Sequence, residues 1–396
     1  MQRGAKFVIT VHAGRIALVC FMASGCSGRS ERQTGPSHSP LVSVFSAPGG
    51  PTVALVDSVV LEESDSAYIG RPGHVFHVAA DGRYFVSDEL SDRLFQFAPD
   101  GELERIIGRP GQGPGEFRKI GPVVTTIDSL LLVQSYGTRR LSVFDRRSGR
   151  FLFSRTYSGH LTSAVVRAGI LYLGNLNVGA LLGAVALPLD RLAASDSADV
   201  LQSTMLMIPA DYRELPELTM FDIVSIAAVP GGLVYGVSAA STLWWVSATG
   251  IGRDSIDLPV RRRRGFPDGS RHLFANRQTF DFKKAIESVS DLSGIWAMSD
   301  GRLILWHNDG IAEMRGSRLA RLSGTPFVSL VSADFQRACV DTPMQTSGNS
   351  RPRLAFARDT LYVLDQVVSD SGESGVQAVV RRYSVDDTTC EWVGGR

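Results

Sequence analysis

The stretch Ile106–Phe117, IIGRPGQGPGEF, decides how the rest of the chain is interpreted. Its four glycines and two prolines predict a tight turn, because glycine accepts positive φ angles and proline fixes φ. A dinucleotide-binding loop would need a third glycine where Glu116 stands, and a carboxylate there would repel phosphate. A P-loop would need lysine where Pro114 stands, and the strand-like segment PVVTTI, not a helix, follows. The stretch is therefore interpreted as a turn between two units of β-structure.

Short strands recur along the chain in six copies of one pattern. In each copy a turn containing Asp or Gly precedes two strands of alternating residues, and a further apolar strand lies upstream. Such alternation predicts β-strands, and the Asp-Gly turns predict hairpins. Each copy therefore predicts about four short antiparallel strands. The copies are Asp81–Gly108, Asp128–Tyr157, Ala168–Leu187, Gly231–Gly250, Asp300–Val340 and Asp359–Val393.

The spacing of the copies is typical of a β-propeller. Tyr84, Leu131 and Tyr172 occupy equivalent strand positions, 47 and 41 residues apart, and a propeller blade has about 40–50 residues. The later intervals are longer, which predicts insertions. We predict an all-β fold, a six-bladed propeller of four-stranded antiparallel blades, or seven blades if an insertion hides another. The strand Thr52–Leu61 lies outside the copies and is expected to join the last blade and close the ring.

The turn between the first two copies also carries a family signature. The signature consists of Gly113, Pro114, Gly115, Glu116 and Phe117. This GPGEF link resembles the NHL-type six-bladed propellers, and in particular the exported six-bladed propeller lipoproteins of bacteria. The strand-end aspartate of that family is matched by Asp88 in the first copy and Asp365 in the last. The strong resemblance covers about residues 68–157 and implies that GPGEF links the first two blades.

The N-terminal segment, residues 1–25, has the pattern of a secretory signal peptide. Basic residues precede the apolar run IALVCFMA, which is too short to cross a bilayer as a helix of about 20 residues. The run leads to Ala23–Cys26, ASGC, which resembles a bacterial lipobox, although Ala23 stands where the pattern usually has Leu. The resemblance implies that Cys26 is lipidated. Ordinary cleavage nearby, with Cys26 incidental, is the alternative.

Residues 26–51 are rich in Ser, Gly and Pro and are predicted to form a flexible tether, with residues 52–396 forming the propeller domain. Ser27 follows the cysteine, and in the lipoprotein family a residue other than Asp favours the outer membrane. The expected location is therefore the outer membrane or periplasmic face, with membrane contact through the lipid only.

The net charge limits the classes of partner that the predicted domain can bind, and its cysteines indicate whether a disulfide can stabilise it. Without residues 1–25 the formal net charge is near −2, which excludes a general nucleic-acid binder. Apart from Cys26, only Cys339 and Cys390 remain, and an exported compartment permits a disulfide between them. Two buried free thiols are the alternative, because the sequence does not show whether their Cα atoms are within reach.

Two insertions interrupt the blade pattern, near residues 195–221 and 257–294. The second contains a basic cluster, and its candidate ligand-binding residues are Arg261, Arg262, Arg263, Arg264 and His272. A solvated loop is the simpler interpretation, and contact with an anion or an acidic glycan is the functional one. Further along, Phe282, Ile286 and Val289 are spaced as on one face of a short amphipathic helix.

A metal site is weakly supported. Propeller lactonases, which this chain resembles in outline, hold calcium in the central channel, so Asp88 and Asp365 are weak candidates at the ends of inner strands. Calcium needs several converging oxygen ligands, and the equivalent positions in the other copies offer no acid. Hydrogen bonds to turn amides are the simpler role for both aspartates. His74 and His77 are three residues apart on a predicted strand. Their side chains are therefore expected to point to opposite faces of the sheet, which does not favour binding of one zinc ion.

These patterns favour an exported, lipid-anchored propeller that acts as a binding or scaffold module at the cell envelope. Its expected partner is a protein, a peptide or a glycan, and no cofactor is predicted. A metal-dependent hydrolase or lyase, with its site and a calcium ion in the central channel, is the alternative. No Ser nucleophile elbow is present in the sequence.

Overall fold

The computed structural model contains two compact units, residues 1–41 and 42–396, and every residue that it describes belongs to the second. The described residues are 44–64, 67–157, 159–177, 181–194, 203–205, 224–238, 240, 242–247, 253–258, 282–316, 318–344, 353–368 and 376–394. The predicted signal peptide, Cys26 and most of the tether lie outside them.

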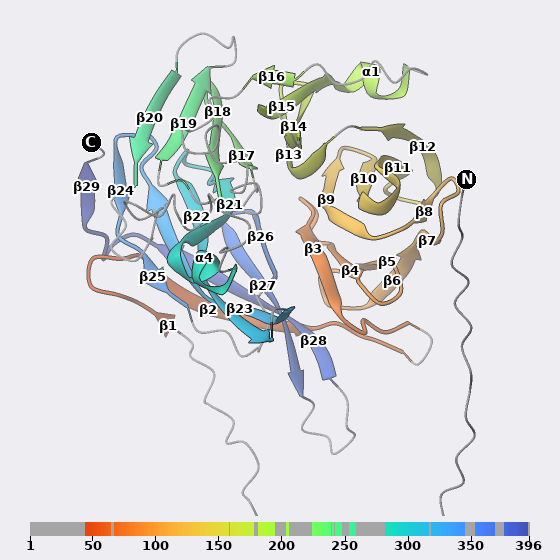
Figure 1. Ribbon diagram of the computed structural model, residues 1–396, viewed down its shortest axis with the longest axis horizontal. Helices are drawn as coiled ribbons and strands as arrows, with labels where there is room; N and C mark the ends of the chain where they lie inside the picture. The colour runs from red at the N-terminus through yellow and green to blue at the C-terminus, as the bar shows by residue number, and fades with distance from the viewer. Residues whose placement is uncertain are drawn as a thin grey trace, which may run out of the picture. The chain divides into compact units, whose positions relative to one another are not determined.

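Six antiparallel sheets form the six blades of a β-propeller, which confirms the predicted fold class (Figure 1). The first blade contains β3 (Pro72–Val78), β4 (Tyr84–Asp88), β5 (Arg93–Phe97) and β6 (Leu103–Ile107). The second contains β9 (Ile120–Ile127), β10 (Leu130–Ser135), β11 (Arg140–Asp145) and β12 (Phe151–Thr156). The third contains β13 (His160–Arg167), β14 (Ile170–Asn177), β15 (Leu181–Pro188) and β16 (Ser203–Met205).

The fourth and fifth blades follow the same order with one elaboration. The fourth contains β17 (Val224–Val229), β18 (Gly232–Val237), β19 (Thr242–Ser247) and β20 (Arg253–Asp257). The fifth contains β21 (Ser290–Ala297), β22 (Leu303–Arg315), β23 (Arg318–Val331), β24 (Arg337–Cys339) and β29 (Trp392–Gly394), with β25 (Thr342–Pro343) also paired to β23. Its two central strands, 13 and 14 residues long, form one hairpin, where the sequence pattern predicted an interrupted copy.

The sixth blade joins both parts of the chain. It contains β26 (Arg353–Ala357), β27 (Thr360–Val368) and β28 (Val376–Asp386), followed at its outer edge by β2 (Thr52–Val60) and β1 (Val44–Phe45). The register runs from Thr52 opposite Asp386 to Val60 opposite Val379. In Figure 1 the early strand β2 lies beside the late strand β28. The predicted closure of the ring by the N-terminal strand is therefore confirmed.

Apolar residues between neighbouring blades form the core. The first strands β26, β3, β9, β13, β17 and β21 contact one another in that order. The first and second blades pack through residues such as Phe85, Phe117 and Phe144, and the fifth and sixth through Trp306 and Leu361. Because strand side chains alternate between faces, each sheet buries apolar residues against both neighbours, as stacked blades require.

Two short α-helices and one 3-10 turn lie among the described residues: α1 (Leu189–Ala194), α4 (Phe282–Ser288) and η1 (Tyr136–Thr138). Helix α4 packs against β22, where Lys283 Nζ donates a hydrogen bond to the Ala312 carbonyl at 3.2 Å. Ile286 is buried, and so is Val289 directly after the helix. The predicted short amphipathic helix is therefore confirmed within the second insertion.

The glycine-rich stretch forms the turn between the first two blades. Its strands β7 (Arg109–Pro110) and β8 (Glu116–Phe117) pair in parallel, and Phe117 is completely buried. The Glu116 carboxylate accepts hydrogen bonds from the Gly113 amide and from Arg109 Nε, both at 2.8 Å. The Gly113 amide, which a phosphate would need, is thus already bonded within the loop.

Each blade has two distinct ends. We call the end at which the first strands begin, near Arg71, Lys119 and Arg353, the entry end. The opposite end, with the tight turns between first and second strands, is the hairpin end. Asp88 ends β4, whereas Asp365 lies three residues before the end of β27, and both strands are second strands of their blades. The expectation that they end inner strands was wrong, because the first strand of each blade lies upstream of the segment in which they occur.

Candidate functional site

Asp88 serves the turn at the entry end of the first blade. It is 2% exposed, and its carboxylate accepts hydrogen bonds from the amides of Arg71 at 2.8 Å and Ser91 at 3.0 Å. These bonds fix the connection that leads into β3 and the turn between β4 and β5. This is the turn-amide role that the sequence offered as the simpler alternative to a metal ligand.

Asp365 is paired inside the sixth blade. It is 7% exposed and forms a buried ion pair with Arg381, which is 6% exposed and lies on the neighbouring strand β28. The other carboxylate oxygen accepts the amide of Gln366 at 2.9 Å. Removing either partner would leave a buried charge, so the pair ties β27 to β28 at the entry end.

A buried polar cluster between the fourth and fifth blades escaped the sequence analysis. Asp291, at the start of β21, accepts hydrogen bonds from the hydroxyls of Ser238 and Ser293, and Asn308 Nδ2 donates to Ser293 Oγ at 2.9 Å. Nearby, the His307 ring stacks on Phe327 with centroids 5.0 Å apart. Serine, Asp and Asn carry no recognisable spacing here, because β21, β22 and the turn after β18 supply them.

Metal-binding side chains do not converge in the part of the chain that the structure describes, where no group of three or more His, Cys, Asp or Glu residues could hold an ion. His77 lies between the first two blades, and its Nε2 is 3.2 Å from Thr126 Oγ1. Burial, aided by the charge of Arg146, lowers the pKa of His77 to about 4. The imidazole is therefore neutral at pH 7. The side chain of His74 is not among those described.

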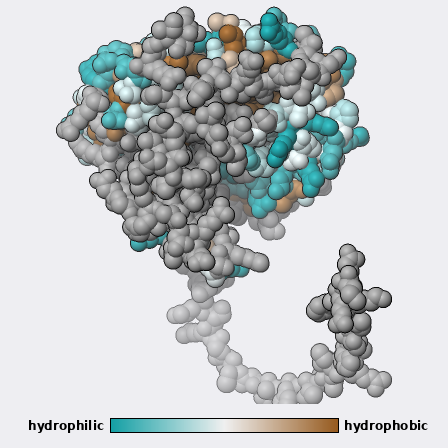
Figure 2. Space-filling model, turned by 45° about the horizontal axis from the view of Figure 1, so that its top comes forward, coloured by the Kyte–Doolittle hydropathy of each residue, from teal (hydrophilic) through white to brown (hydrophobic). Residues whose placement is uncertain are grey.

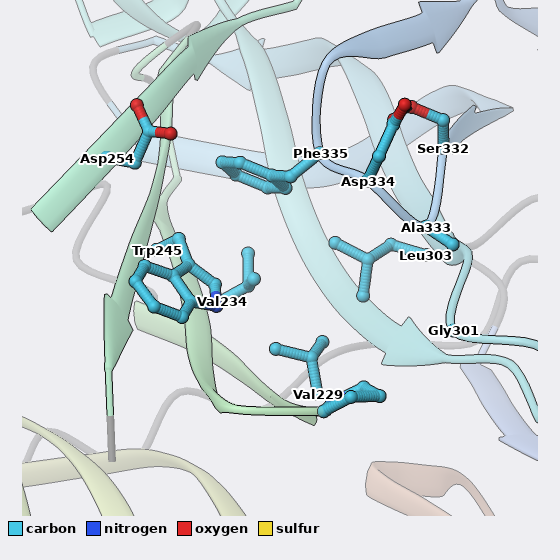
Figure 3. A pocket seen from close by; sticks show the side chains of 11 residues that line it. Val229, Val234, Trp245, Asp254, Gly301, Leu303, Ser332, Ala333, Asp334 and Phe335 are labelled. Atoms are coloured by element: carbon cyan, nitrogen blue, oxygen red, sulfur yellow. Dashed lines mark hydrogen bonds between the residues drawn. The ribbon is translucent and has the colours of Figure 1, made fainter. Parts of the chain in front are cut away.

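A pocket of 240 Å³ lies at the hairpin end between the fourth and fifth blades. In Figure 3 the rings of Trp245 and Phe335 project into the space between β19 and the turn that precedes β24. Val229, Val234 and Leu303 supply apolar walls. The pocket therefore has two aromatic and several aliphatic surfaces.

Two carboxylates, those of Asp254 and Asp334, also line this pocket, and both side chains are exposed. Asp334 is fixed by the Ser332 hydroxyl at 2.5 Å and the Gln336 amide at 3.1 Å. These bonds, with the serine hydroxyl contributing most, lower the pKa of Asp334, so its charge persists at mildly acidic pH. Aromatic faces and carboxylates both attract cations. No motif in the sequence marked these residues, which come from separate strands and turns.

The sequence-predicted basic cluster cannot be compared with this pocket. Arg261, Arg262, Arg263, Arg264 and His272 lie outside the described residues, as does nearly all of the first insertion, residues 195–221. Of the second insertion, helix α4 and β21 are described. Figure 2 shows one face of the molecule, where hydrophilic residues cover much of the coloured surface and hydrophobic ones form small patches.

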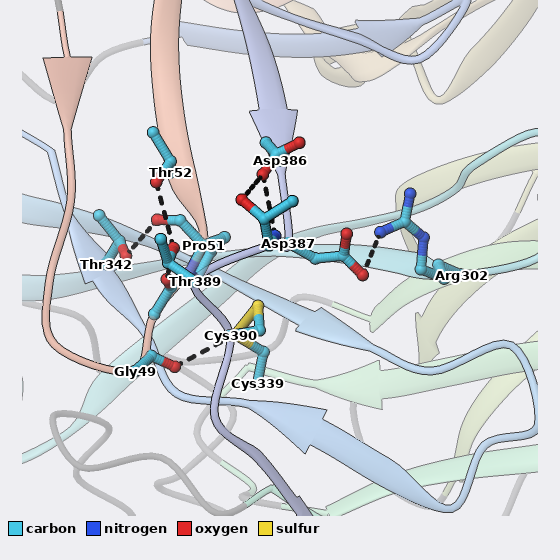
Figure 4. The surroundings of a disulfide bond; sticks show 12 residues. Gly49, Pro51, Thr52, Arg302, Cys339, Thr342, Asp386, Asp387, Thr389 and Cys390 are labelled. Atoms are coloured by element: carbon cyan, nitrogen blue, oxygen red, sulfur yellow. Dashed lines mark hydrogen bonds and ion pairs between the residues drawn. A yellow bond between two sulfur atoms is a disulfide. The ribbon is translucent and has the colours of Figure 1, made fainter.

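Cys339 and Cys390 form a disulfide with a Cα–Cα distance of 5.4 Å. It links β24 to the segment before β29, whose residue Trp392 lies opposite Cys339 in the sheet. Around it, the hydroxyl of Thr342 donates to the Pro51 carbonyl at 2.6 Å, and that of Thr389 donates to the Gly50 carbonyl at 2.8 Å (Figure 4). The two ends of the domain are thus fastened together near this bond.

Known proteins resemble this chain at the level of the fold. A family model described as "DUF5128: 6-bladed beta-propeller" matches residues 53–152, which span the ring-closing strand and most of the first two blades. The GPGEF turn lies within this match. No curated protein matches the sequence.

Two crystal structures from Bacteroides are similar to it. A member of the DUF4221 family from Bacteroides vulgatus ATCC 8482 has a TM-score of 0.58 at 10% identity, covering 86% of this chain and 99% of its own. A protein of Bacteroides fragilis NCTC 9343, named only provisionally as exported, has a TM-score of 0.56 at 11% identity. That match covers 83% of this chain and 94% of its own. At such low identity these likenesses show the fold alone.

Proposed function

We propose that this protein is an exported, lipid-anchored propeller of the NHL-like bacterial type, acting as a binding module at the cell envelope. The signal-like residues 1–25, the lipobox-like Cys26 and the tether-like composition that follows support export and anchoring. The provisionally named exported protein of similar fold agrees with this location. In the described part of the chain, no helix has the length and apolarity needed to cross a membrane.

The pocket between the fourth and fifth blades carries the binding function. Its 240 Å³ suits a single side chain or a compact small molecule. Trp245 and Phe335 would contact an aliphatic stem, and the carboxylates of Asp254 and Asp334 would attract a positive charge at its end. We therefore assign to this pocket a lysine or arginine side chain of a partner peptide or protein.

Catalysis in the channel has less support. The metal-dependent alternative depends on Asp88 and Asp365. The Asp88 carboxylate accepts hydrogen bonds from turn amides, and Asp365 forms an ion pair with Arg381. Binding is therefore the function that the geometry favours.

Calorimetric titration with N-acetyl-lysine amide tests the pocket, with N-acetyl-norleucine amide as a control that keeps the stem and lacks the charge. We expect the lysine compound to bind more tightly. In the double variant Asp254→Asn/Asp334→Asn its affinity should fall roughly twofold to thirtyfold, since each exposed ion pair contributes about 0.2–1 kcal/mol. The same double change at Asp100 and Asp128, in turns of the first and second blades, is the matched control.

Equal binding of the two compounds would contradict the cationic ligand, and no binding of either would contradict a side-chain pocket. The anchor is tested separately with Cys26→Ala. We expect this variant to leave the membrane fraction and to appear as soluble exported protein. Its continued retention in membranes would refute lipidation at Cys26 without affecting the pocket.

A further inference from the structure

A second surface lies at the entry end of the first two blades, away from the pocket at the hairpin end. It comprises Tyr68, Leu90, Arg118, Lys119, Tyr136 and Arg139, and we call it the basic-aromatic strip. These residues come from four connections: the segment before β3, the turn between β4 and β5, the link before β9, and the turn between β10 and β11. None of them takes part in the pocket.

Hydrogen bonds make the strip continuous. The amide of Lys119 donates to Asp92 Oδ1 at 2.9 Å, which joins the second blade to the first. The amides of Tyr136 and Gly137 donate to the carbonyls of Lys119 and Arg118, both at 2.8 Å. The η1 turn and the link before β9 therefore form one bonded unit.

Large apolar side chains are exposed along this strip. Tyr68, Leu90 and Tyr136 are 60%, 66% and 42% exposed. Tyr68 and Leu90 lie together over Gly70, since a Cβ placed there would be 3.4 Å from Tyr68 Cε2 and 2.9 Å from Leu90 Cδ1. The ring of Tyr136 rests near His160, with centroids 5.0 Å apart. Exposed apolar residues that gather in one place are typical of interaction sites.

The cations of the strip are not neutralised by their described neighbours. Arg118, Lys119 and Arg139 form no ion pair within the described residues. At the margins, by contrast, Arg71 pairs with Glu89 and Arg109 with Glu116, each at 2.8 Å. The result is a local excess of positive charge on a chain whose formal net charge is +1.

Two carboxylates near the strip are already bonded to backbone amides. Asp92 accepts the Lys119 amide, and Glu63 accepts the Ile69 amide at 3.0 Å. Burial raises the pKa of Glu63, against the opposing effect of the Ile69 amide. The three cations of the strip outnumber these two carboxylates, so its net charge is positive even when both are ionised.

The backbone of the strip is also held in place. Asp92, Lys119 and Arg139 adopt left-handed φ angles of 50°, 55° and 53°. Such angles are uncommon outside glycine, and the hydrogen bonds from the backbone amides of Lys119, Tyr136 and Gly137 hold this part of the backbone in place. A surface that is already ordered loses less conformational entropy when a partner binds.

We infer that the basic-aromatic strip docks an acidic polypeptide segment that also carries apolar side chains. Tyrosine and arginine are the residue types that dominate protein interfaces, and the apolar side chains of the strip would be buried against the partner. A plain polyanion, such as an acidic polysaccharide, would use the cations and leave Tyr68 and Leu90 exposed. The inference depends on neither the lipid anchor nor the pocket.

Selection from a random peptide display library on the immobilised full chain tests this inference. We expect enriched peptides to contain Asp or Glu together with Leu, Phe or Tyr. Their dissociation constants are then measured by fluorescence anisotropy. Binding should weaken at least tenfold in Arg118→Gln/Lys119→Gln/Arg139→Gln and at high salt. It should weaken at least fivefold in Tyr68→Ser/Leu90→Ser/Tyr136→Ser.

The matched control is Arg147→Gln/Arg150→Gln/Arg167→Gln, which removes three charges at the hairpin end and should bind like the wild type. Thermal unfolding of every variant separates loss of binding from loss of folding. Several results would overturn the inference: no enriched peptide, enrichment without acidic residues, or unchanged affinity in either strip variant. Polygalacturonate that binds as tightly as the best peptide would assign the strip to a polysaccharide instead.

Discussion

Gly108 and Gly169 have nearly equal φ angles, 71° and 72°, and very different surroundings. A Cβ at Gly108 would lie 2.2 Å from Phe117 Cε2, whereas a Cβ at Gly169 would meet nothing within 4 Å. Glycine is therefore required at position 108 by the left-handed φ angle and by the close contact with Phe117. At position 169 it is required by the φ angle alone.

Substituting each glycine by alanine separates the two requirements. Gly169→Ala should lower the free energy of unfolding by about 1–2 kcal/mol, the cost of a left-handed alanine. Gly108→Ala should lose a further 1–3 kcal/mol or so, because Phe117 must move out of its packed position. Chemical denaturation measures both. Equal losses in the two variants would show that the Phe117 contact does not constrain the turn.

His77 makes stability depend on pH at the residue scale. Its native pKa of about 4 lies below the 6.5 of the unfolded chain, so the unfolded state binds the proton first as the pH falls. Stability should therefore decrease from pH 6.5 toward pH 4 by roughly 1.4 kcal/mol per unit, about 3 kcal/mol in all. Denaturation curves of His77→Gln should show a shallower decrease. Parallel profiles for the two proteins would exclude this role of His77.

At the scale of elements, the disulfide holds β29 on the fifth blade although the strand before it, β28, belongs to the sixth. It closes a loop of 51 residues, for which the chain-entropy relation gives about 4 kcal/mol. Cys390→Ala should lower the free energy of unfolding by up to that amount. Reduced wild-type protein should unfold like the variant, and a variant as stable as the oxidised protein would show that the bond adds nothing.

At the scale of the whole molecule, stability depends on closing the ring. Strand β2 covers the edge of β28, and Val53 at 0% and Leu61 at 2% exposure are buried by this closure. Removing residues 1–61 should cost at least about 3 kcal/mol, since each buried Val or Leu contributes about 1.5–3 kcal/mol. It would also expose a strand edge that favours aggregation.

Removal of residues 1–43 is the control for this truncation, because it leaves both β1 and β2 in place. Thermal unfolding and size-exclusion chromatography compare the two shortened proteins. We expect the protein that lacks residues 1–43 to have the melting temperature of the full chain. The protein that lacks residues 1–61 should melt at a lower temperature and self-associate. A shorter protein that stays monomeric and equally stable would contradict closure by β2.

Sequence alone predicted most of the β-strands, favoured six blades over seven and located the GPGEF turn, because alternation and glycine placement act through neighbouring residues. It also identified α4 from the spacing of Ile286 and Val289. Only the tertiary structure assembled the pocket of Trp245, Asp254 and Phe335 and the strip that runs from Tyr68 to Arg139. Their residues are distant in sequence and become neighbours when adjacent blades pack against each other, and no local pattern records such a contact.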